Sequence, residues 1–194
     1  MALFSRLFGG SGSVSARGSQ VTTADRPFVM KNPAIGFLNL QGERGAKLAE
    51  CDSRALSPLF TASQMSQNGV PRCDVLFVYC DINASGSVEG TSDSLRGLIE
   101  KAGAYVAVIA TENVGDAYIK ALQSPTDWHA NLVCILDRKG PKFADFFRRL
   151  FERMNKGKSM LMAWVEIAPQ IPGADNPDVP DSFMAAEAGH VTFR

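Results

Sequence analysis

The sequence lacks any excess of charge, because its twenty lysine and arginine residues balance twenty aspartate and glutamate residues. A chain without net charge has no long-range field that would draw it to a nucleic-acid backbone or an anionic membrane. It also lacks any apolar run close to the roughly 18 residues that a membrane-spanning helix needs. These absences argue against a nucleic-acid partner and predict no transmembrane segment.

Cysteine and histidine are scarce as well, with four and two residues, and no two cysteines form a C-x-x-C pair. Cys80 and Cys134 fall within apolar runs, which predicts buried free thiols in a reducing compartment. Neither His129 nor His190 has the spacing of a zinc ligand. We therefore expect a cytoplasmic protein without a disulfide framework or a zinc site.

Residues 1–32 contain a glycine- and serine-rich stretch and no acidic residue before Asp25. Such a segment buries too little apolar area to order itself, so we expect a disordered or extended N-terminal arm before a single domain over residues 33–194. Four apolar residues at helical spacing predict a docking segment for a partner or a membrane surface, and the acid-free start also resembles an organelle transit peptide. The four apolar residues are Leu3, Phe4, Leu7 and Phe8.

From residue 34 onward, short apolar runs alternate with helical patterns. Runs of this length between turn signals are typical of strands buried on both faces of a parallel sheet. We predict an α/β protein, a three-layer α/β/α sandwich with a mostly parallel central sheet of the Rossmann-like or flavodoxin-like kind. Strands are expected at 34–40, 75–80, 104–111, 131–136 and 190–194, and helices at 43–50, 56–65, 93–102, 115–122 and 140–157. Residues 160–168 fit a strand or a buried helix, and their position after a helix favours a strand.

Acidic side chains follow three of the expected central strands: Asp81, Glu112 and Asp137. If these strands are parallel, their carboxyl ends place the three acids along one edge of the sheet. Carboxylate oxygens are the ligands that Mg²⁺ takes in proteins. The sequence therefore offers these acids as a candidate metal site.

The loop after Asp81 adds three short oxygen-bearing side chains, Asn83, Ser85 and Ser87. The Asp-x-Asn-x-Ser run at 81–85 resembles the Asp-x-Ser-x-Ser metal site of von Willebrand A-type domains, with Asn83 in place of the first serine. Asp137-Arg-Lys-Gly resembles the Asp-Gly turn of the same family. The resemblance implies a bound divalent ion, with the loop side chains as ligand-binding groups.

Two other kinds of site remain open. The stretches at 85–87 and 90–92 before an expected helix are similar to a flavodoxin-type phosphate loop, which would hold a phosphoryl group through backbone N–H groups. Cys80, at a strand end and followed by an acid, is similar to the nucleophile of caspase-like peptidases. Those enzymes place the activating histidine on an earlier strand, whereas both histidines here follow Cys80.

The helix expected at 140–157 carries basic side chains opposite its apolar face, among them Arg148, Arg149 and Arg153. Because no complete catalytic set forms in chain order, we predict a non-enzymatic interaction or scaffold module. It would engage a protein partner, or a second copy of itself, through the arm and the basic helix 142–157. The alternative is an enzyme or sensor that binds Mg²⁺ or a phosphoryl ligand at the strand ends.

Overall fold

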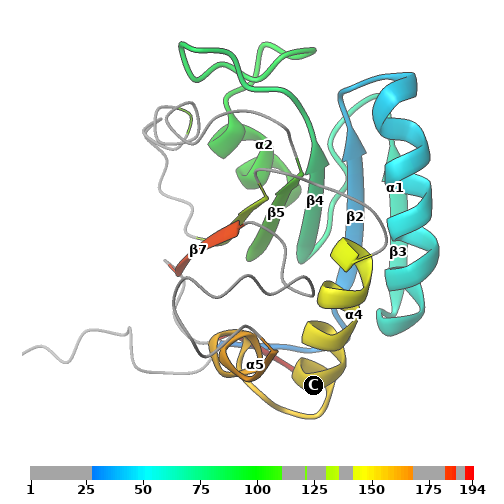
Figure 1. The fold of residues 1–194 in the computed structure, drawn as a ribbon, viewed down its shortest axis with the longest axis vertical. Helices are drawn as coiled ribbons and strands as arrows, with labels where there is room; N and C mark the ends of the chain where they lie inside the picture. The colour runs from blue at the N-terminus through cyan, green and yellow to red at the C-terminus, as the bar shows by residue number, and fades with distance from the viewer. Residues whose placement is uncertain (1–27, 111–120, 122–129, 136–141, 168–181, 187–190) are drawn as a thin grey trace, which may run out of the picture.

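The computed structural model describes residues 28–110, 121, 130–135, 142–167, 182–186 and 191–194 (Figure 1). It is an α/β fold whose central sheet has the strand order β3-β2-β4-β5-β6-β7, with four parallel central strands. Edge strand β3 is also parallel, and edge strand β7 is antiparallel. The strands are β2 (Ala34–Asn39), β3 (Ala62–Ser66), β4 (Val75–Tyr79), β5 (Val106–Ala110), β6 (Asn131–Ile135) and β7 (Ser182–Ala186).

Helices cover both faces of this sheet because β4 and β5 present buried side chains in both directions. One face packs against α1 (Glu43–Leu56) and α4 (Lys142–Asn155), and the other against α2 (Leu95–Ala102). Within the described ranges, no helix is long and apolar enough to cross a bilayer. A separate two-stranded sheet pairs β1 (Phe28–Met30), inside the range expected for the arm, with β8 (Val191–Phe193).

An aromatic cluster fixes α4 on the sheet. Phe77 of β4 meets the rings of Phe143, Phe147 and Phe151 at centroid distances of 6.1, 5.3 and 6.3 Å, each close to edge-on. Edge-to-face packing of this kind adds about 0.5–1.5 kcal/mol per pair beyond the burial of area. All six apolar positions that predicted this helix are buried, so its apolar face is used by the core: Phe143, Phe146, Phe147, Leu150, Phe151 and Met154.

Two element predictions were wrong. For residues 160–168 a strand was favoured over a buried helix, but Met160–Ile167 forms helix α5, because Ser159 caps its start and Trp164 packs edge-on against Phe146 at 4.6 Å. Residues 56–65 were expected as a helix, but Ser57–Leu59 forms one 3₁₀ turn and β3 then pairs with β2. In both cases contacts with distant segments override the local pattern.

The connection from β3 to β4 crosses over β2 without a helix. Its residues 67–74 are fewer than the dozen or more that a parallel crossover normally takes. The path is open only because Gly36 of β2 has no side chain. A Cβ there would lie 2.6 Å from Cys73 Sγ and 2.9 Å from Pro71 Cγ. Backbone hydrogen bonds from Cys73 to Ala102 and from Asp74 to Ala34 hold the crossing segment in place.

We predict that Gly36→Ala destabilises the fold by about 1–3 kcal/mol, because the new methyl group overpacks the crossing. Urea denaturation of the variant and the wild type measures this loss. The double variant Gly36→Ala/Cys73→Ala removes the closest atom and should lose less than the sum of the two single variants. Strictly additive losses would contradict the proposed contact.

Candidate functional site

The carboxyl ends of β2 and β4 form the point where the sheet order reverses. The chain leaves β2 toward β3 on one side, and β4 lies on the other side, with Asn39 opposite Tyr79. Open α/β sheets bind ligands at such switch points, outside the carboxyl ends of the strands. Two loops meet here, the β2–α1 turn and the loop that follows β4 (Figure 1). A Cβ on Gly90 of the second loop would lie 3.0 Å from the carbonyl oxygen of Leu40.

A buried asparagine builds the β2–α1 turn. Asn39 Nδ2 donates to the Gly42 carbonyl at 2.7 Å, and its Oδ1 accepts from the Gln41 N–H at 3.0 Å. Gly42 has φ of 60°, in the left-handed region that favours glycine. A side chain on Gly45 would collide with the same Asn39 amide. The turn is therefore held from within, and it aims Gln41 and Arg44 at the neighbouring loop.

Asp81 is neutralised at this switch point. Gln41 Nε2 donates to Asp81 Oδ1 at 2.9 Å, and Arg44 forms an ion pair with Asp81 Oδ2. The Asp81 side chain is 23% exposed, whereas that of Arg44 is 56% exposed. Both carboxylate oxygens already have donors, so a cation would have to displace Arg44. An anion would instead find a guanidinium at the rim.

Asn83 braces the loop that follows. Its Oδ1 accepts from the Ser85 N–H at 3.0 Å, the Ser85 hydroxyl at 2.5 Å and the Ser87 N–H at 3.1 Å. A bridge between the buried residues Ile82 and Val88 closes the loop. The oxygen that the metal-site resemblance offers as a ligand is thus saturated by the loop itself.

The structure brings only part of the predicted metal set together. Asp81 lies beside the loop of Asn83, Ser85 and Ser87, while Glu112 and Asp137 lie outside the described residues. Across the described ranges, no three His, Cys, Asp or Glu side chains lie close enough to hold a metal ion. The three-acid site therefore stays a prediction.

The thiols differ sharply in their surroundings. Cys80 is fully buried, Cys51 is exposed, and both histidines lie outside the described residues. Burial raises the pKa of Cys73 to about 12; the Asp74 carboxylate raises it as well, and a backbone hydrogen bond from Gly36 opposes the shift. A thiol that stays protonated in this way is a poor nucleophile.

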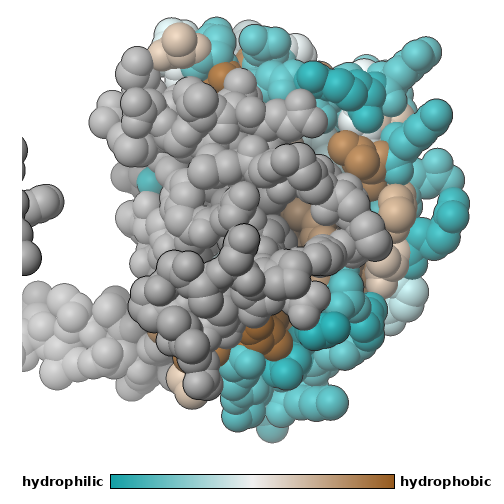
Figure 2. Space-filling view, in the orientation of Figure 1, coloured by the Kyte–Doolittle hydropathy of each residue, from teal (hydrophilic) through white to brown (hydrophobic). Residues whose placement is uncertain are grey.

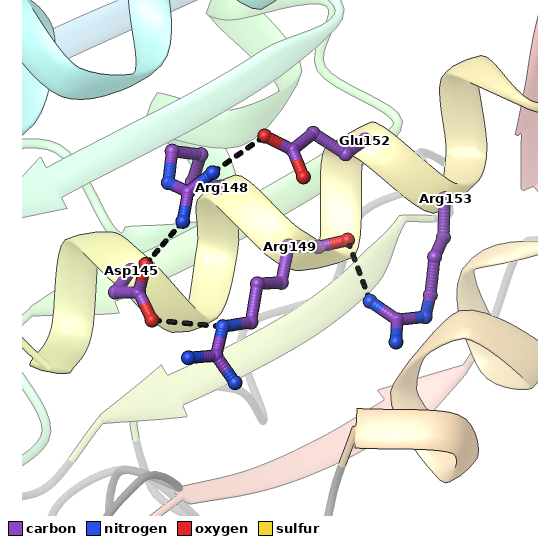
Figure 3. A network of polar contacts seen from close by, with 5 residues as sticks. All are labelled: Asp145, Arg148, Arg149, Glu152 and Arg153. Carbon is purple, nitrogen blue, oxygen red and sulfur yellow. Dashed lines mark hydrogen bonds and ion pairs between the residues drawn. The ribbon is translucent and has the colours of Figure 1, made fainter.

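Arg148 and Arg149 of α4 form ion pairs with acidic side chains of the same helix (Figure 3). Arg148 bridges Asp145 at 2.5 Å and Glu152 at 2.6 Å, and Arg149 reaches Asp145 at 2.8 Å. The Arg148 guanidinium, followed by Arg149, holds the pKa of Asp145 below its usual range, so these pairs persist at neutral pH. Of the predicted partner-binding residues, Leu3, Phe4, Leu7 and Phe8 lie outside the described residues.

Sequence reasoning missed the outward face of α5. Leu161, Met162 and Val165 are 38, 51 and 53% exposed, and they are three of the five large apolar side chains exposed in the described part of the chain. Figure 2 shows hydrophobic surface near the position of α5, bordered by hydrophilic surface. The sequence could have predicted this exposed face. A surface helix of eight residues buries one side only, and this helix is apolar on nearly every side.

Comparison with known proteins transfers no function to this chain. No family model matches it. No curated protein and no solved structure matches it at a significant level either. The function therefore has to be argued from the residues themselves.

We predict that iodoacetamide labels Cys51 of the native protein well before Cys73 or Cys80. Cys51 is exposed, while the other two thiols are buried. Peptide mapping by mass spectrometry after short exposures, with a urea-unfolded sample as the control for equal reactivity, measures the order. Rapid labelling of Cys80 in the folded protein would contradict this expectation and would support a nucleophilic role.

Proposed function

We propose that the protein is an interaction module that binds an acidic protein partner through the surface formed by α4 and α5. This α4–α5 surface consists of Leu161, Met162 and Val165 of α5, with Arg153 of α4, which pairs with Glu166 of α5, and Arg149 one helical turn before it. The supporting observation is the concentration of exposed apolar side chains on one short helix. Contiguous exposed apolar groups with a polar rim are typical of protein-binding sites.

The α4–α5 surface is held rigid before any partner arrives. Trp164 packs on Phe146, and Glu166 accepts from Arg153 at 3.2 Å and from Lys158 at 2.6 Å. These contacts fix helix α5 against α4, so the helix that carries the outward side chains does not have to be repositioned on binding. A preorganised surface loses less entropy on association, which favours affinity.

The charge around this surface is positive. Residues 142–167 contain six basic and three acidic side chains, a difference of +3. Although Arg148, Arg149 and Arg153 each have an acidic neighbour, the excess remains and steers an acidic partner. The N-terminal arm, with its apolar residues near the start, is proposed as a second contact with the same partner.

We expect Met162→Glu/Val165→Glu to abolish partner binding, because the two charges would have to be buried against an acidic, apolar counterpart. Val29→Glu is the matched control, since Val29 is also an exposed apolar side chain, at 39%. The measurement is affinity isolation with the intact protein, identification of a stoichiometric partner, and titration of the purified pair with each variant. Equal affinities for both variants would contradict the α4–α5 surface, and a lowered melting temperature in either would expose a folding defect. Deletion of residues 1–20 tests the arm in the same titration.

The switch point supports a second candidate function, the binding of a phosphoryl ligand. Taken in chain order from β2, the five parallel strands have the sheet order 2-1-3-4-5, that of flavodoxin-like doubly wound folds. We propose that Arg44 meets the ligand's negative charge at the rim of this switch point, because the N–H groups of residues 85–87 are taken by Asn83. Gln41 and Asp81 hold Arg44 in place.

Measurements of thermal unfolding distinguish a phosphoryl ligand from a divalent cation at the switch point. A bound ligand raises the melting temperature with its concentration. Pyrophosphate should stabilise the wild type but not Arg44→Gln, because the variant keeps hydrogen-bonding capacity and loses the charge. Mg²⁺ alone should have no effect on either protein. Stabilisation by Mg²⁺ that disappears in Asp81→Asn would favour the metal site instead.

A further inference from the structure

The edge strand β3 is exposed along nearly its whole length. Residues 62–65 are exposed and Ser66 is partly exposed, although β3 pairs with β2 over five residues. The cause lies in the crossover, since the segment that passes over Gly36 takes the place of a helix. Met65 is 48% exposed, which is unusual for a large apolar residue in a strand.

Backbone groups of Ser63 and Met65 point away from the sheet. The Ala34 carbonyl accepts from the Asp74 N–H, and the Leu40 N–H donates to Tyr79, so even-numbered residues of β2 face β4. By the alternation of a strand, Ile35 and Phe37 face β3. In a parallel ladder the residues paired with Ile35 and Phe37, which are Ser63 and Met65, then direct their own N–H and C=O groups outward.

Among the residues that the structure describes, this edge has no charge, proline or paired strand that would keep other strands away. Natural edges are protected by lysine, proline, bulges or covering segments. The stretch from Thr61 to Gly69 has no charged residue and no proline. Within the described ranges, β2 is the only strand paired with β3.

We propose that the protein forms a two-fold symmetric dimer in which β3 pairs antiparallel with β3 of a second copy. A second copy fits because an uncharged edge meets itself without like-charge repulsion. The outward groups also match. Pairing Ser63 of one copy with Met65 of the other closes four backbone hydrogen bonds, and Gln64 then lies on the two-fold axis, where its amide side chain can both donate and accept.

A cross-link tests this register directly. In a Cys51→Ser background, Gln64→Cys places two thiols opposite each other in a non-hydrogen-bonded pair, with Cα atoms about 4.5 Å apart, which suits a disulfide. Ala62→Cys is the matched control, because residue 62 would pair with Ser66 of the second copy and its thiol would have no thiol opposite it. Under mild oxidation the first variant should form a covalent dimer, and the second should not. Equal cross-linking of both variants, or of neither, would overturn the proposal.

A charge-swap pair tests the contact without new cysteines. Ser63→Lys/Met65→Lys sets lysine opposite lysine twice and should weaken self-association by about tenfold. Ser63→Lys/Met65→Glu sets lysine opposite glutamate and should restore it, with the same loss of the Ser63–Ser57 hydrogen bond in both variants. Sedimentation across a dilution series, with circular dichroism as the check on folding, gives the readout. A wild-type chain that stays monomeric throughout, or two variants that associate equally, would overturn the dimer.

Discussion

The close passage of the chain over Gly36 is the constraint on which the rest of this structure depends. Because Gly36 has no Cβ, Pro71 and Cys73 can approach β2 closely, and a short segment carries the chain from β3 across β2 to β4. That crossing sets the strand order and creates the switch point between β2 and β4. It also removes the helix that would otherwise shield β3. One missing side chain thus links the candidate ligand site to the exposed sheet edge.

The distribution of apolar side chains separates the core from the candidate surfaces. The phenylalanines of α4 are all buried: Phe77 of the sheet meets three of them, and Phe146 packs against Trp164 of α5. Helix α5 and strand β3 are different, since each turns apolar groups toward water. Exposed apolar groups gain free energy when a partner covers them, whereas the ion-paired arginines of α4 gain little. Binding is therefore expected to depend on α5 and β3, with the arginines setting specificity.

Polar residues at the switch point serve mainly to shape loops. Asn39 and Asn83 each satisfy several backbone groups of their own loops, and Gln41 and Arg44 occupy the carboxylate of Asp81. Two of the predicted ligands, Asp81 and Asn83, are thus engaged by protein donors. Of the two partners in this ion pair, Arg44 is the more exposed and Asp81 the more buried.

The sequence alone determined the elements whose burial is a local property. The runs at 75–80 and 104–111 predicted strands because both faces of such strands are buried, and the spacing from Phe143 to Met154 predicted α4 because one face of that helix is buried. Only the tertiary structure decided the nature of β3 and α5 and the pairing of Asp81 with Arg44. Residues 62–66 have no apolar alternation and become a strand through their register with β2, while Asp81 meets a cation 37 positions earlier in the chain. Patterns encode which side chains must avoid water, but contacts between distant segments decide which partner covers them.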